Sequence, residues 1–182
     1  MVHIPFSRTA RNWWAHREIL HQLKKNRWQF SDERLNFLLF EDWNRYYLPI
    51  DVTGLVVLDV GAGEGETAMF FLNHGASKVI CIESEPSAFE ILKRNSANHP
   101  DKMEIYQKLF DLNDLSMKYD FMKMDIEGYE ESLLDSTPLA VPAVIEVHGL
   151  QLKDKFRKQN YRIDDFLNEA SRNCISFAYW KC

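Results

Sequence analysis

The sequence predicts an α/β fold with a doubly wound, mostly parallel sheet and an N-terminal helical extension. From residue 54 onward, short apolar runs alternate with stretches of helical periodicity, which is the pattern of strand–helix–strand units. The first of these runs leads directly into the glycine-rich segment 61–65 and then into a helix, as in sheets that bind ligands where the strand order reverses. The 182 residues suffice for one such domain with an appendage.

Residues 1–50 are predicted to form the helical, aromatic-rich extension, and residues 51–182 the main domain. The extension contains ten of the 24 aromatic residues and has a charge balance of +3, whereas the rest of the chain carries −8. One helix is predicted over residues 11–27, and a second from Ser31, a suitable N-cap, to Pro49. A nucleic-acid surface, a lid over a ligand, and packing on the main domain or on a second subunit all fit this composition. Packing is the favoured interpretation, because most aromatic side chains of proteins pack in the interior or at interfaces.

The predicted elements of the main domain follow in order. Strands are expected at residues 55–60, 78–83, 103–106, 121–125, 143–147 and 175–180. Helices are expected at residues 64–73, from residue 86 onward, and at residues 129–134, 152–159 and 164–171. Gly75 is placed to end the first of these helices, and Pro86 suits the first turn of the second.

Composition excludes several classes of protein. No apolar run approaches the roughly 18 residues of a membrane span, so no membrane association is predicted. The N-terminal residues lack the apolar stretch of a secretory signal, so a cytoplasmic location is expected. Cys81, Cys174 and Cys182 are too scattered for a disulfide framework or a zinc site. The net charge of −5 argues against a nucleic-acid partner, although a local basic patch in the extension remains an alternative.

The glycine-rich turn after the first predicted strand is the expected cofactor site. Asp59 precedes this turn, and Gly61, Ala62 and Gly63 form it. Glycines at this position let the backbone approach a ligand closely, although a tight turn without a ligand has the same sequence.

Carboxylates at the ends of neighbouring strands indicate a nucleoside-bearing cofactor. Asp59, Glu83 and Asp125 each end or nearly end a predicted strand, so we expect them at one rim of the sheet. Glu83, with Ser84 beside it, is placed to accept hydrogen bonds from the two hydroxyls of a ribose. A dinucleotide fingerprint would need glycine where Glu66 stands, and acidic residues at this helix N-terminus would repel a pyrophosphate. The P-loop motif of ATPases is absent from the sequence.

The string LDVGAGEG at residues 58–65, followed by Glu83, resembles the first two motifs of class I S-adenosylmethionine-dependent methyltransferases. This resemblance implies a Rossmann-like, class I methyltransferase fold. It also implies S-adenosylmethionine as the cofactor and S-adenosylhomocysteine as the product. The cationic sulfonium and amino acid tail of that cofactor suit an acidic rim, which would not suit phosphate.

Two further blocks resemble the FkbM family of methyltransferases. Residues 119–134 contain a strand ending in Lys-x-Asp-x-Glu-Gly and a short helix, and residues 142–148 contain a strand ending in Glu-x-His. The resemblance covers about residues 54–150 and implies O-methylation of a hydroxyl on a small molecule or sugar. Sheets of the family normally close with a terminal hairpin, whereas only one strand is predicted here after residue 147. We therefore expect one sheet edge to be missing or supplied by a partner, and a homo-oligomer through that edge or the extension is an alternative.

A hydroxyl acceptor needs a base, or a metal that lowers its pKa. Asp125 and His148 lie at adjacent predicted strand ends, so either is a candidate base, with Glu146 or Glu127 orienting it. His148 is preferred because its unperturbed pKa lies near 6.5, although a structural role for a single histidine is equally open. Asp125 and Glu127 are alternatively candidates to hold a divalent cation. Capping of the helix that begins at Gly128 is the favoured role for Glu127.

Two other functions remain open. Residues 75–95 are also similar to the corresponding region of archaeal-type tRNA guanine methyltransferases, which makes RNA methylation the runner-up. The substrate-binding domain and the base-reading motif of those enzymes are not found in this sequence. A methyltransferase fold with a missing edge is also compatible with a non-catalytic interaction module.

Overall fold

The computed structural model describes residues 17, 20–21, 23–40, 43–135, 139–167 and 174–181. The strands are β1 Val56–Val60, β2 Lys78–Glu83, β3 Met103–Gln107, β4 Phe121–Met124, β5 Ala143–Glu146, β6 Arg162–Leu167 and β7 Cys174–Trp180. The helices are α2 Asp32–Phe40, α3 Trp43–Tyr47, α4 Glu66–Asn73, α5 Pro86–Ser96 and α6 Leu150–Lys158. Two short 3₁₀ helices, Leu112–Ser116 and Tyr129–Asp135, lie in the connections after β3 and β4.

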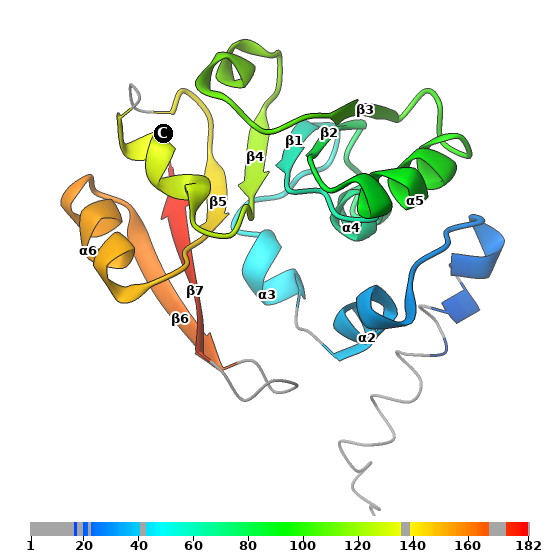
Figure 1. Ribbon diagram of the computed structural model, residues 1–182, viewed down its shortest axis with the longest axis horizontal. Coiled ribbons are helices and arrows are strands. Elements are labelled where there is room, and N and C mark those ends of the chain that lie inside the picture. The colour runs from blue at the N-terminus through cyan, green and yellow to red at the C-terminus, as the bar shows by residue number, and fades with distance from the viewer. Residues whose placement is uncertain are drawn as a thin grey trace, which may run out of the picture.

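The seven strands form one sheet in the order β3-β2-β1-β4-β5-β7-β6 (Figure 1). β1 to β5 are parallel, whereas β7 runs antiparallel to both β5 and β6. The order reverses between β1 and β4, so the predicted doubly wound, mostly parallel sheet is confirmed. None of the described helices has the length and apolar character of a membrane span.

Both faces of the sheet are covered, which explains why the central strands are mostly apolar and buried along nearly their whole length. Successive residues of β1 point to opposite faces. Val57 lies in the core that contains Phe71 of α4, and Leu58 lies in the core that contains Phe156 of α6. All four of these side chains are excluded from solvent, so the site at the strand ends rests on a closely packed support.

The extension packs on the main domain, as the favoured interpretation predicted. Trp43 contacts Phe70 of α4 at a ring-centroid distance of 5.7 Å, and Tyr46 stacks on Phe177 of β7 at 5.1 Å. The Ser31 Oγ accepts a hydrogen bond from the backbone N–H of Arg34, which confirms the predicted cap of α2. The described residues 17, 20–21 and 23–25 are helical, residues 26–27 form a turn, and the rest of the helix predicted over residues 11–27 lies outside the described residues.

The helix predicted over residues 164–171 is wrong in its described part, because residues 162–167 form strand β6. Cross-strand contacts to β7 explain the difference. Phe166 packs against Phe177 at 5.8 Å, and the Asp165 carboxylate accepts a hydrogen bond from the Ser176 hydroxyl. The sheet therefore has a terminal hairpin. The predicted missing edge is wrong, and with it the reason to expect a partner there.

Candidate functional site

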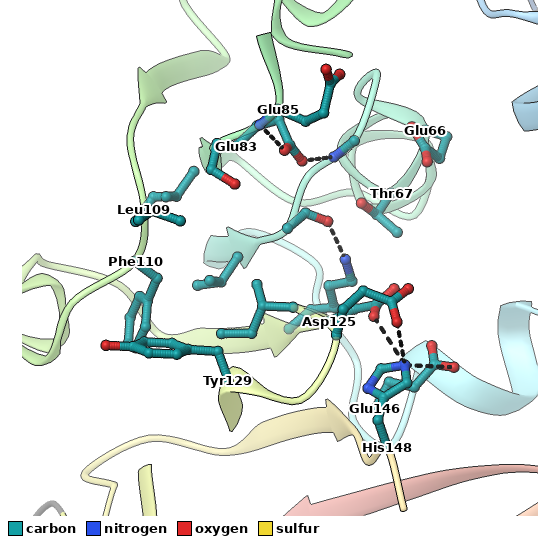
Figure 2. A pocket seen from close by; sticks show the side chains of 18 of the residues that line it. Glu66, Thr67, Glu83, Glu85, Leu109, Phe110, Asp125, Tyr129, Glu146 and His148 are labelled. Atoms are coloured by element: carbon teal, nitrogen blue, oxygen red, sulfur yellow. Dashed lines mark hydrogen bonds and ion pairs between the residues drawn. The ribbon is translucent and has the colours of Figure 1, made fainter. Parts of the chain in front are cut away.

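A cavity of about 670 Å³ opens at the carboxyl ends of the parallel strands, where the strand order reverses. Figure 2 shows Glu83 and Glu85 at one end of this cavity, and Asp125, Glu146 and His148 at the other. The extension contributes to its wall through Arg34, Trp43 and Tyr47. The extension therefore forms part of the cavity wall, which agrees with the alternative that it is a lid over a ligand.

The glycine turn after β1 is fixed between the two neighbouring strands. The backbone N–H groups of Gly61 and Ala62 donate to the carbonyl oxygen of Ile82, and the N–H of Asp125 donates to that of Val60. Gly61 has a φ of +73°, and a Cβ atom at this position would lie 1.8 Å from the carbonyl oxygen of Asp125. Only glycine permits this approach, so the glycine shapes the floor of the cavity.

Glu83, the last residue of β2, is held by two backbone amides. Its Oε2 accepts from the N–H of Gly63 at 2.7 Å, and its Oε1 accepts from the N–H of Glu85 at 2.7 Å (Figure 2). Each carboxylate oxygen has two acceptor positions, so each keeps one for a ligand in the cavity that Glu83 lines. Ser84 follows it on the same wall.

Below the glycine turn, Asp59 and Lys123 form an ion pair that solvent does not reach. Lys123 Nζ lies 3.2 Å from Asp59 Oδ1 and donates to the carbonyl oxygen of Gly61 at 2.7 Å. Thr67 donates to Asp59 Oδ2 at 2.5 Å. Burial raises the pKa of Asp59. Burial acts to lower the pKa of Lys123, but Asp59 and other nearby carboxylates raise it above its ordinary value, so the lysine is charged.

Glu66, at the N-terminus of α4, is a buried carboxyl on the cavity wall. It accepts a hydrogen bond from the N–H of Glu64 and lies 3.3 Å from a guanidinium nitrogen of Arg34. Burial raises its pKa from 4.5 to about 7, although Arg34 opposes the shift. Glu64 in turn accepts from the N–H of Ser31, so both acidic residues of this turn tie the extension to the cavity.

We expect Glu66→Gln to flatten the pH dependence of stability between about pH 4.5 and 7. A carboxyl whose pKa is higher in the folded than in the unfolded state binds its proton more tightly when folded, so stability falls as the pH rises through this window. Glutamine keeps an acceptor for the N–H of Glu64 and carries no charge. The variant should gain up to about 3 kcal/mol over wild type at pH 8, measured by urea unfolding. Glu90→Gln, an exposed change on α5, is the control. Parallel pH profiles for wild type and Glu66→Gln would contradict the prediction.

At the far end of the cavity, His148 lies among four carboxylates. Its Nδ1 lies 3.0 Å from Oε1 of Glu130, a carboxylate with 0% exposure. Its Nε2 lies 3.8 Å from Asp125 Oδ1, 3.7 Å from Glu127 Oε2 and 3.8 Å from Glu146 Oε1 (Figure 2). The hydrogen bond to Glu130 and the nearby carboxylates raise the pKa of His148 to about 9, although burial opposes the shift.

This geometry corrects the reason for which His148 was preferred as the base. That preference assumed a pKa near 6.5, whereas the carboxylates around the ring hold a proton on it at neutral pH. An imidazolium has no lone pair to accept a further proton. The carboxylates of Asp125 and Glu146 can accept one, so they are the better candidates for that role.

Most of the predicted site residues meet at the cavity. Gly61, Gly63, Glu83, Ser84, Asp125, Glu146 and His148 line it. Asp59 and Ala62 are fully buried and lie outside its lining. Sequence reasoning missed Lys123 and Glu130 as buried charges. A lysine within the otherwise apolar strand β4 was the available signal, because a charge there requires a partner.

Comparisons with known proteins agree with the fold. No protein-family model matches the chain. The chain is 32% identical over 108 residues to protein arginine N-methyltransferase 6 of Danio rerio, a match that covers 57% of this chain. The match spans only 31% of the length of that relative.

Two solved structures have a similar fold. A methyltransferase from Pyrococcus furiosus superposes with a TM-score of 0.64 at 14% identity, over 96% of this chain and 98% of that one. Fibrillarin of Aeropyrum pernix, in complex with natively bound S-adenosyl-L-methionine, gives a TM-score of 0.56 at 12% identity, over 75% and 76% of the two chains. The protein therefore has the Rossmann-like methyltransferase fold. The FkbM family is not singled out by these matches.

Proposed function

We propose that the protein is an S-adenosylmethionine-dependent methyltransferase. The observation that supports this most strongly is Glu83, a buried carboxylate at the end of β2 that two backbone amides orient toward the cavity. Its two open acceptor positions fit the paired hydroxyls of a ribose. The fold and the acidic lining of the cavity agree with this assignment.

The residues around the cavity fit this cofactor chemically. Gly61 and Gly63 keep side chains away from the floor, and Ile82 and Phe110 offer apolar surface to a base. Asp125 places negative charge where a cationic ligand would be stabilised. When bound, S-adenosylmethionine supplies a methyl group on a positively charged sulfur. A sulfonium is favoured in such a cavity, whereas a pyrophosphate would be repelled.

For the acceptor we propose a hydroxyl of a small molecule or sugar, as the likeness of residues 119–134 and 142–148 to the FkbM signature implies. Two observations support this choice. Asp125 and Glu146 are carboxylates at the cavity end opposite Glu83, where the proton of a hydroxyl can be accepted. Leu109 and Tyr129, 77% and 57% exposed, give the cavity wall apolar surface for the rest of an organic acceptor.

A cationic nitrogen acceptor in a protein is the second candidate. The carboxylates of Asp125, Glu127 and Glu146 would attract a guanidinium or an ammonium group. The name of the Danio rerio relative, an arginine N-methyltransferase, agrees with this alternative.

An RNA acceptor, the runner-up on sequence grounds, is the third candidate, because exposed cationic side chains of the extension and of α5 lie on neighbouring segments. Lys24, Lys25 and Arg27 are exposed in the extension, and Lys93 and Arg94 are exposed on α5. The side chain of Asn98 donates to the backbone carbonyls of both Arg27 and Arg94, so these segments are neighbours.

Radiolabelled methyl transfer to hydroxylated small molecules, arginine-containing peptides and total RNA separates the three candidates. A protein that binds the cofactor and modifies none of them would support the non-catalytic alternative.

Calorimetric titration with S-adenosylhomocysteine tests the cofactor assignment. We expect micromolar binding by the wild type. Glu83→Ala should weaken it roughly 10- to 150-fold, through the loss of charge-assisted hydrogen bonds worth about 1.5–3 kcal/mol. Glu90→Gln, on the exposed side of α5, should bind like the wild type. Circular dichroism shows whether each variant is folded. Wild-type affinity in a folded Glu83→Ala would remove the ribose role, and no binding by the wild type would remove the cofactor assignment.

A further inference from the structure

Asp125, Glu127, Glu146 and His148 form a cluster in which one ring nitrogen faces three carboxylates. His148 Nε2 lies 3.7–3.8 Å from an oxygen of each of the three. These distances exceed those of hydrogen bonds, so no carboxylate accepts directly from this nitrogen. The ring and the carboxylates therefore surround a point that none of these side chains fills.

The buried carboxylate of Glu130 determines which ring nitrogen of His148 carries a proton and which one can offer a lone pair to the point between the carboxylates. The Nδ1 of His148 lies 3.0 Å from Glu130 Oε1, and an ionised carboxylate only accepts hydrogen bonds. When a cation displaces the second proton of the ring, Nδ1 therefore keeps its proton, and Nε2 offers its lone pair to the cation. Metal-binding histidines are commonly oriented in this way by a carboxylate on the second ring nitrogen.

Glu130 also fixes the two chain segments that bear the cluster. Its Oε2 accepts from the N–H of Gly128, directly after Glu127, and its Oε1 accepts from the N–H of His148. Because Glu130 has 0% exposure, these bonds form where water does not compete. One buried side chain thus holds the residues after β4 and after β5 at a fixed separation.

We propose that Asp125, Glu127 and His148 bind one divalent cation, with Glu146 beside them. One ligand atom from each of the three lies within 4.8 Å of the others. Ligands about 2.2 Å from one ion lie at most about 4.4 Å apart, so a few tenths of an ångström of closure suffices. Glu127 is 87% exposed and can supply that movement.

The ligand set indicates an ion of the Mg²⁺ or Mn²⁺ class. Carboxylate oxygens suit both ions, and a single imidazole is most compatible with Mn²⁺. Three protein ligands leave octahedral positions for water or for an acceptor oxygen. This last role rests on the proposed function, because a bound cation would lower the pKa of an acceptor hydroxyl.

Titration with MnCl₂, followed by the electron paramagnetic resonance signal of free Mn²⁺, tests the site without a turnover assay. We expect one Mn²⁺ per chain, with an affinity that falls at least tenfold in Glu127→Gln and in Asp125→Asn. Glu127→Gln changes an exposed side chain and should leave the fold intact. Glu131→Gln is the matched control, since it removes a half-exposed carboxylate that lies four residues further along and pairs with Lys155.

Three results would overturn the site. The first is no loss of the free Mn²⁺ signal up to about 1 mM. The second is equal affinity in wild type and Glu127→Gln, and the third is equal weakening in Glu127→Gln and Glu131→Gln. A parallel titration with S-adenosylhomocysteine separates this inference from the proposed function, because either ligand can bind without the other.

Discussion

Gly61→Ala is expected to unfold the glycine turn and abolish binding of S-adenosylhomocysteine. The added Cβ would overlap the carbonyl oxygen of Asp125, 1.8 Å away, and this oxygen belongs to backbone that cannot rotate aside. The left-handed backbone conformation at φ +73° destabilises the folded state by about a further 1–2 kcal/mol for any residue with a Cβ atom. Together with an overlap cost of about 1–3 kcal/mol, this should lower the free energy of unfolding by about 2–5 kcal/mol, as measured by chemical denaturation.

Gly54→Ala separates the two causes. Gly54 has a similar φ of +78°, but a Cβ there would meet no atom within 4 Å. It should lose only the conformational part, about 1–2 kcal/mol, and keep ligand binding. Equal destabilisation in both variants would show that the close approach of Gly61 to the carbonyl oxygen of Asp125 does not require glycine at this position.

Lys123→Met is expected to lower the free energy of unfolding by about 3–5 kcal/mol, because it leaves the carboxylate of Asp59 buried without its cation. It also removes the donor to the carbonyl oxygen of Gly61, so the cavity floor should loosen and affinity for S-adenosylhomocysteine should fall. Chemical denaturation and calorimetry measure the two effects.

The double variant Asp59→Asn/Lys123→Met tests the cause. Since it removes both charges, it should recover most of the lost stability. Lys78→Met is the matched surface control, because Lys78 pairs with Glu104 where both side chains are more than a third exposed. It should cost less than about 1 kcal/mol. A loss in Lys123→Met no greater than in Lys78→Met would contradict the buried ion pair.

The hydrophobic pattern of the sequence was sufficient to locate the strands that are almost completely buried. β1, β2, β4 and β5 are buried on both faces and mostly apolar, so their positions follow from composition and from the glycines and prolines between them. It failed at β6, an edge strand with Asp164 and Asp165, because its pairing with β7 comes from partners that local periodicity does not reveal.

Candidate site residues were predictable where topology alone places them. The carboxyl ends of parallel strands meet at one rim, so Glu83, Asp125, Glu146 and His148 were expected at one cavity, and all four line it. Their chemical states were not predictable. The pKa of His148 depends on Glu130, which stands 18 positions earlier in the chain and reaches the ring only in the folded protein.

By itself, the sequence determined the doubly wound sheet, the glycine turn and the acidic rim, because hydrophobic pattern and backbone freedom are local properties of the chain. Only the tertiary structure decided which charges are buried and what they contact. It placed Lys123 beneath the glycine turn, Glu130 behind His148, and the extension against the cavity wall. These arrangements depend on distances between segments that are far apart in the chain, and the energy of a charge depends on those distances and on its exclusion from water.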